Sequence, residues 1–181
     1  MSHQEQINFC LKIKEKFNPK FTNAKVLDVG SLDVNGNNKY LFWDNCNYLG
    51  IDIASGNNVD LVSLGHEYSA PDEEYDIIVS TECFEHDKYW DKTLLNIIRM
   101  LKSGGLFFFT CATTGRAEHG TSKSEPLTSP LTIRIEDWKN YYKNLTEQDI
   151  KEILEMDKIF SEYEFNVDEK HHDLNFWGIK K

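Results

Sequence analysis

The sequence lacks any apolar run long enough to span a membrane. Its longest runs, such as residues 106–109, are far shorter than the roughly 20 residues of a transmembrane helix. Residues 1–5 lack the basic stretch and apolar segment with which a secretory signal begins. We therefore expect a cytoplasmic protein with no membrane partner.

The chain also lacks the ligand spacing of a metal site. Its four cysteines form no Cys-x-x-Cys pair and lie mostly in apolar surroundings, which favours reduced, buried thiols over disulfides. The run His171-His172-Asp173 offers potential ligands, but it lies among charged residues in a predicted hairpin turn. We therefore expect no bound metal ion. The cysteines are Cys10, Cys46, Cys83 and Cys111.

Positive charge is scarce relative to negative charge. The chain has 20 Lys and Arg against 30 Asp and Glu, so its formal net charge is −10. Proteins that bind nucleic acid usually present a basic face, and such a partner is therefore disfavoured. The 181 residues, 40% of them hydrophobic and 28% charged, predict one globular domain over residues 1–181.

Runs of consecutive apolar residues predict a parallel sheet, because they are typical of strands buried on both faces. A helix that carries Leu94, Ile97 and Leu101 separates the last two runs, and Gly104-Gly105 suit its end and the turn that follows. Strands that alternate with helices indicate an α/β fold with right-handed crossovers. The predicted strands are residues 25–29, 47–53, 59–62, 75–80 and 106–111.

The two ends of the chain complete the predicted elements. Apolar spacing predicts a helix over residues 4–17, and Pro19 stops it. Thr146, with an acidic residue three positions on, is a cap-like start for a later helix. Residues 159–181 predict two strands joined by a charged turn near residues 168–172.

The segment after the fifth strand has a different composition. Residues 113–130 are rich in Thr, Ser, Gly and Pro, which predicts a long loop, and long loops inside a domain are often functional lids. Trp138, Tyr141 and Tyr142 predict a short helix whose rings pack a core or a lid more readily than they line a pocket. We expect residues 113–150 to form a loop or lid region on the substrate side.

Two strand ends predict a nucleotide-like ligand. Gly30 follows the first strand, where a glycine lets the backbone approach a ligand closely. Asp52 ends the second strand about twenty positions later, where related folds hold ribose hydroxyls. Open α/β sheets bind nucleotides in the crevice at this edge. Alternatively, the turn at Gly30 is only a tight turn without a ligand, and Asp52 is only a solvated strand end.

The strands and their ends carry five motifs. They are Val26-Leu27-Asp28-Val29-Gly30, Leu49-Gly50-Ile51-Asp52, Tyr75-Asp76-Ile77-Ile78-Val79, Glu85-His86 and Leu101-Lys102-Ser103-Gly104-Gly105. Their order and spacing resemble class I S-adenosylmethionine (SAM)-dependent methyltransferases over about residues 20–112, and more loosely beyond. The resemblance implies a doubly wound, Rossmann-like and mostly parallel seven-stranded sheet of order 3-2-1-4-5-7-6, with the last strand antiparallel. SAM is the implied cofactor.

The resemblance also implies roles for individual residues. Gly30 and Ser31 would border the methionine part of SAM, and Asp52 would hold the ribose. Ile53 would pack on the adenine, and residues 63–66 would border the edge of this base. The residues directly after the fourth strand would lie beside the methionine or the mouth for the acceptor. The implied cofactor-binding residues are Asp28, Gly30, Ser31, Asp52, Ile53, Ser63, Leu64, Gly65, His66, Thr81 and Glu82.

The sequence departs from the common family pattern at two places. Leu32 and Val34 stand in the first turn where small residues are often found. Leu64 stands at the adenine edge, where the family often has an acid. Backbone groups would then have to bind the edge of the base.

Two histidines are the candidate catalytic residues. His86 follows the fourth strand, and His119 lies in the loop after the fifth, so both would emerge near the methyl group. A histidine there can accept a proton from a hydroxyl or amine acceptor. Positioning alone can supply much of the rate of methyl transfer, so a general base is not required. A packing role is the alternative, above all for His86.

Other functions stay open at this point. A dehydrogenase would use a similar acidic residue, but its usual G-x-G-x-x-G turn is missing. A non-catalytic module of the same fold that serves a partner protein is a second alternative. The small domain and acidic composition favour a small-molecule acceptor over a protein acceptor.

Overall fold

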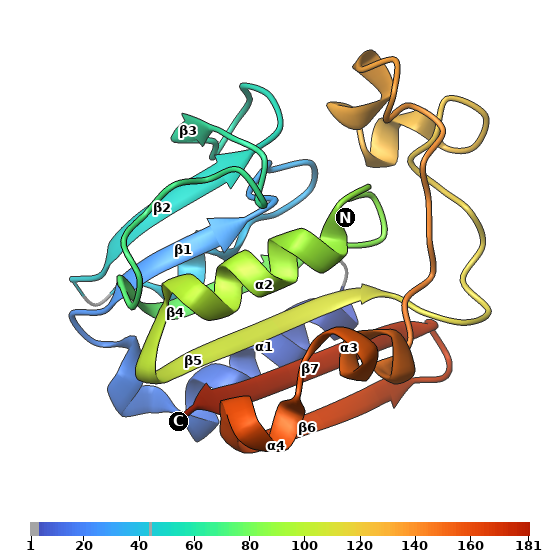
Figure 1. Ribbon diagram of the computed structural model, residues 1–181. Coiled ribbons are helices and arrows are strands. Elements are labelled where there is room, and N and C mark those ends of the chain that lie inside the picture. Colours follow the sequence, from blue (N-terminus) through green and yellow to red (C-terminus); the bar gives the residue numbers. More distant parts are fainter. Residues whose placement is uncertain (1–3, 44) are drawn as a thin grey trace.

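The computed structural model describes residues 4–43 and 45–181, which form a seven-stranded sheet with flanking helices (Figure 1). The strand order is β3-β2-β1-β4-β5-β7-β6. The pairs among β1 to β5 are parallel, whereas β7 is antiparallel to both β5 and β6. The predicted order and the reversed last strand are thereby confirmed. The strands are β1 Lys25–Val29, β2 Asn47–Asp52, β3 Leu61–Val62, β4 Tyr75–Thr81, β5 Leu101–Ala112, β6 Phe160–Asp168 and β7 Asp173–Lys180.

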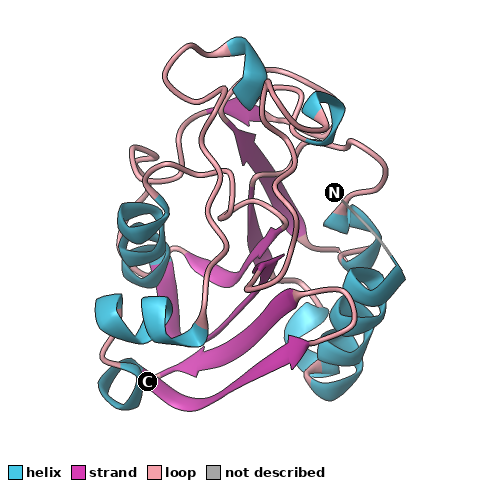
Figure 2. Cartoon of the chain, turned by 90° about the vertical axis from the view of Figure 1, so that its right-hand side faces the viewer, coloured by secondary structure: helices cyan, strands magenta, loops and turns pink. Residues whose placement is uncertain are grey.

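Helices cover both faces of the sheet (Figure 2). Helix α1 packs on one face, and α2, α3 and α4 pack on the other. In the described part of the chain, no helix combines the length and the apolar content that crossing a membrane requires. The helices are α1 Gln4–Lys16, α2 Trp90–Met100, α3 Glu147–Ile153 and α4 Met156–Ile159, with short 3-10 turns at η1 Asn18–Phe21, η2 Asn38–Leu41, η3 Pro126–Thr128 and η4 Thr132–Arg134.

The central strands are apolar on both faces because each face contributes to a separate core. In β1, Val26 packs on the α1 side and Leu27 on the α2 side. In β5, Phe107 and Phe108 divide in the same way. Consecutive apolar residues therefore suit a sheet that is covered by helices on both sides.

The alternation of strands and helices is less regular than predicted. The chain passes from β1 to β2 through the 3-10 turn η2, and from β2 to β3 through turns alone. Residues 35–38 read Asn-Gly-Asn-Asn, and these residue types favour turns over helix interiors. The short helix predicted at Trp138, Tyr141 and Tyr142 is also wrong, because the chain forms turns from 136 to 140 and irregular structure after them.

The two glycines after α2 lie inside a strand. Strand β5 begins at Leu101, directly after the helix, and the pairing with β4 is interrupted between Tyr75 and Ile77. Gly104 lies in this irregular part with φ +73°, a conformation that glycine adopts without strain. Gly104 and Gly105 therefore shape a bulge in β5 rather than the end of the helix.

A buried carboxylate joins the first strands of the sheet on the α1 side. Asp28 in β1 accepts hydrogen bonds from the Tyr48 hydroxyl at 2.6 Å and from Asn38 Nδ2 at 3.0 Å. Asn38 also donates to Thr81 Oγ1 at 3.0 Å. Burial raises the pKa of Asp28 from 3.8 to about 6, although these hydrogen bonds oppose the shift. The network links β1, β2, η2 and the end of β4.

This network predicts a pH dependence of stability. The folded pKa of Asp28 lies above its unfolded value, so ionised Asp28 destabilises the fold, fully above pH 6 and not at all below pH 4. Between pH 7 and pH 5 the free energy of unfolding should therefore gain about 1 kcal/mol from this residue. Urea unfolding of the ligand-free wild type and of Asp28→Asn should reveal that gain as the difference between them. Identical pH profiles would contradict the assignment.

Candidate functional site

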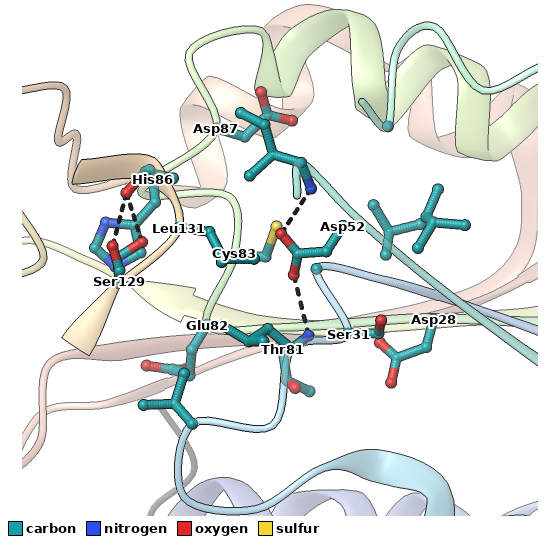
Figure 3. A pocket seen from close by; sticks show the side chains of 18 of the residues that line it. Asp28, Ser31, Asp52, Thr81, Glu82, Cys83, His86, Asp87, Ser129 and Leu131 are labelled. Atoms are coloured by element: carbon teal, nitrogen blue, oxygen red, sulfur yellow. Dashed lines mark hydrogen bonds between the residues drawn. The ribbon is translucent and has the colours of Figure 1, made fainter. Parts of the chain in front are cut away.

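A cavity opens at the carboxyl edge of β1, β2 and β4 (Figure 3). The turns that follow these strands form most of its wall, and residues 128–132 with Trp138 form the opposite side. The implied cofactor-binding residues all line this cavity except His66. The wall thus joins residues that lie more than a hundred positions apart in the sequence.

The turn after β1 is held against the end of β2. Gly30 has φ +81°, and its N–H and that of Ser31 donate to the Ile51 carbonyl at 2.9 and 3.0 Å. A methyl group on Gly30 would lie 2.4 Å from Cys83 Sγ, so glycine is required both for the conformation and for the close approach. The Ser31 hydroxyl donates to the Asn58 carbonyl at 2.9 Å.

Asp52 lies at the centre of the cavity wall (Figure 3). The Leu32 N–H donates to its Oδ2 at 3.0 Å, and the Ile53 N–H donates to its Oδ1 at 2.7 Å. Burial raises the pKa of Asp52, and the two backbone donors partly oppose this effect. A carboxylate offers about four lone-pair sites, so two N–H donors leave capacity for further hydroxyl donors.

The turn after β3 borders the same end of the cavity. The Ser63 N–H donates to the Asp52 carbonyl at 2.9 Å, and Asn96 Nδ2 in α2 donates to the Gly65 carbonyl at 2.8 Å. Leu64 lines the cavity between them. His66 turns away, and its ring packs 4.5 Å from the Tyr89 ring. The location of His66 therefore suits packing behind the wall.

The turn after β4 forms the floor. Glu82 has φ +52°, and its Oε1 accepts the Thr110 hydroxyl at 2.7 Å. Burial holds the pKa of the Cys83 thiol well above its usual value, so this thiol stays protonated. Asp87 accepts the Thr93 hydroxyl at 2.5 Å, and burial raises its pKa. All three side chains line the cavity.

The lining is acidic. It includes Asp28, Asp52, Glu82 and Asp87, and no Lys or Arg is found among the described residues that line it. A cavity of this charge favours a cationic ligand and disfavours a pyrophosphate, which binds best to basic groups and helix N-termini. The charge therefore argues against a dinucleotide such as NAD.

The two candidate catalytic histidines meet at one end of the cavity. Their ring centroids are 5.0 Å apart, and Tyr142 lies 5.6 Å from His86 and 5.0 Å from His119. His86 lines the cavity, whereas His119 packs behind it and is only 4% exposed. Burial and then the neighbouring His119 lower the pKa of His86, and burial lowers that of His119, so both imidazoles are neutral.

The run His171-His172-Asp173 has structural contacts of its own. The His171 ring hydrogen-bonds Asp168 at 2.8 Å, and Arg116 donates to Asp173 at 3.1 Å. A methyl group at Gly115 would lie 2.6 Å from His172 Nδ1. These contacts join the β6–β7 turn to the loop after β5.

Sequence reasoning missed several residues of the wall. Gln6 from α1, Asn38 from η2 and residues 128–132 all line the cavity. None of them belongs to a motif with a fixed spacing from the strand ends. Asn38 likewise had no signal in the sequence, because its hydrogen bond to the buried Asp28 carboxylate exists only in the fold.

Comparisons with known proteins agree with this geometry. The family model of a methyltransferase domain matches residues 1–170. No curated protein sequence matches the chain. Among solved structures, one similar protein is the Burkholderia thailandensis 1,6-didemethyltoxoflavin N1-methyltransferase with S-adenosylhomocysteine bound. Its TM-score is 0.64 at 15% identity, and the match covers 96% of this chain and 77% of that enzyme's chain.

Two further solved structures share the fold. Haemonchus contortus phosphoethanolamine N-methyltransferase 2 has a TM-score of 0.64 at 18% identity, and the match covers 96% of this chain and 52% of that enzyme's chain. The YcgJ protein of Bacillus subtilis has a TM-score of 0.63 at 13% identity and covers 99% of both chains. With the family match over most of its length and with this sheet order, the chain belongs to the methyltransferase-domain family and is a class I SAM-dependent methyltransferase.

Proposed function

We propose that this protein transfers the methyl group of SAM to a small-molecule acceptor that binds beside His86. When bound, SAM would supply a methyl group on a positively charged sulfonium: the lone pair of the acceptor would bond to that methyl carbon while the carbon–sulfur bond breaks, and S-adenosylhomocysteine would leave as a neutral thioether. Asp52 holds the ribose hydroxyls, and Ile53 and Leu64 border the adenine. Gly30 and Ser31 border the methionine part, with Thr81 and Glu82 below it.

The position of Asp52 carries this proposal. Its two oxygens are oriented by backbone N–H groups and retain acceptor capacity toward the cavity. Two vicinal ribose hydroxyls match that capacity. The remaining acidic lining suits a ligand with a sulfonium and an ammonium group, and it opposes the pyrophosphate of a dinucleotide.

The second wall of the cavity supports a small acceptor. Residues 128–132 lie across the cavity from the strand ends and limit the space beside His86. The similar methyltransferases from Burkholderia thailandensis and Haemonchus contortus are named for small acceptors, 1,6-didemethyltoxoflavin and phosphoethanolamine. A protein acceptor is the alternative.

The first test concerns the cofactor. S-adenosylhomocysteine should stabilise the protein against heat, and NAD should not, because the acidic lining has no Lys or Arg among its described residues to bind a pyrophosphate. At 100 times its dissociation constant a ligand stabilises by about 2.7 kcal/mol, which thermal-shift measurements detect easily. If neither SAM nor its product raises the melting temperature at millimolar concentration, SAM does not bind here and the proposal fails.

The second test removes the carboxylate. Asp52→Ala should weaken SAM binding by about 1.5–3 kcal/mol, or roughly ten- to a hundred-fold, since two charge-assisted hydrogen bonds are lost. Isothermal titration calorimetry measures this change. Asp72→Ala is the matched control, because Asp72 pairs with Arg99 outside the cavity. Equal affinities for wild type and Asp52→Ala would show that the ribose is held elsewhere.

The third test concerns the loop of residues 113–130, which we propose to act as a lid over the acceptor. His119→Ala should lower turnover more than it changes SAM affinity, because His119 lies behind His86 and away from Asp52. Loss of a general base should cost on the order of 10²–10⁴ in turnover, and loss of positioning about tenfold. Turnover near the wild-type rate would leave His119 with a packing role only.

A further inference from the structure

Three buried side chains behind the acceptor end of the cavity form a compact cluster. Glu85 and His86 follow β4, and His119 comes from the loop after β5. One ligand atom from each lies within 4.8 Å of the others, and no ion is present. Glu85 is 0%, His86 5% and His119 4% exposed. Segments far apart in the sequence thus converge on one buried point.

The polar atoms of this cluster lack hydrogen-bond partners among the described residues. Within residues 4–43 and 45–181, neither carboxylate oxygen of Glu85 and neither ring nitrogen of His86 has one, and the Tyr142 hydroxyl beside them also has none. Buried polar groups in native proteins are almost always paired. Such a concentration of unpaired atoms among the described residues favours a ligand bound between them.

His119 is oriented for a ligand. Its Nδ1 lies 3.1 Å from the Ala117 carbonyl, and a carbonyl there selects the tautomer with hydrogen on Nδ1. The lone pair of Nε2 is then available to a metal ion, and metal-binding histidines in proteins are usually oriented by such a second hydrogen bond. Gly120, the next residue, has φ +64°, and a methyl group on it would lie 2.5 Å from the His86 ring.

We propose that Glu85, His86 and His119 bind a divalent transition-metal ion. Two imidazoles and one carboxylate are a common ligand set for such ions, whereas Mg²⁺ and Ca²⁺ prefer oxygen ligands throughout. This set leaves coordination positions open, and one of the three ligands, His86, lines the cavity (Figure 3). The absence of metal-like sequence spacing is no obstacle, because the three ligands come from two different loops.

A bound ion would favour some classes of methyl acceptor over others. An open position on a Lewis acid binds an oxygen or nitrogen of the acceptor and lowers the pKa of a bound hydroxyl. This consequence rests on the proposed methyl transfer, whereas the metal site itself does not. Acceptors with two neighbouring oxygens would gain most, since one can be bound while the other is methylated.

Titration of tag-free, chelator-treated protein with Co²⁺ alone tests the site. Calorimetry should give one ion per chain, and visible absorption should show imidazole-bound Co²⁺. Glu85→Gln and His119→Ala should each lower the affinity at least about tenfold. Circular dichroism and an S-adenosylhomocysteine melting shift should confirm that both variants fold. Those readouts keep a failure of the metal site distinct from a failure of cofactor binding.

The variant His171→Ala is the matched control, because it removes a histidine outside the cluster whose ring hydrogen-bonds Asp168. It should bind Co²⁺ as tightly as the wild type. The proposal is overturned if the wild type binds no Co²⁺ at millimolar concentration. It is equally overturned if Glu85→Gln and His119→Ala both retain wild-type affinity, or if the control loses as much affinity as they do.

Discussion

Burial of the central sheet on both faces constrains everything else in this molecule. Val26 and Leu27, adjacent in β1, enter two separate cores, and β4 and β5 behave in the same way. Strands β1 to β5 pair in parallel, an arrangement that needs both faces of the sheet to be covered, and parallel strands end at one edge. The turns after β1, β2, β3 and β4 therefore meet around a single cavity, where their polar residues act together.

Within that cavity, one carboxylate organises two of the turns. Asp52 accepts N–H groups from Leu32 and Ile53, so it fixes the turn after β1 while it faces the ligand space. Asp28 has a comparable role deeper in the sheet, where it joins Tyr48 and Asn38. The acidic character of the site thus follows from groups that also hold the sheet edge together, and it selects a cationic cofactor over a dinucleotide.

Much of this arrangement could be predicted from local signals. The apolar runs indicated the parallel sheet, and the distance from Gly30 to Asp52 indicated the cofactor side. The resemblance to methyltransferases supplied the strand order, because the pattern of apolar residues does not show which strands pair. The β1–β2 connection was harder, because a helix was assumed where Asn and Gly favour turns.

The acceptor side could not be predicted to the same depth. Residues 128–132 line the cavity without any motif, and His119 reaches Glu85 and His86 only through the path of a long loop. Spacing rules for metal sites apply to ligands on one local element, so they cannot detect ligands that two loops bring together. Similarly, the position of His66 predicts a place at the adenine edge, whereas its ring contact with Tyr89 could not be predicted from the sequence.

The central claim is that the edge of β1, β2 and β4 forms the SAM site with Asp52 on the ribose. A crystal structure with S-adenosylhomocysteine bound tests this claim most directly. We expect both ribose hydroxyls within hydrogen-bond distance of the Asp52 carboxylate and the adenine between Ile53 and Leu64. A ligand bound at another surface, or a ribose that leaves Asp52 in contact only with the N–H groups of Leu32 and Ile53, would contradict it.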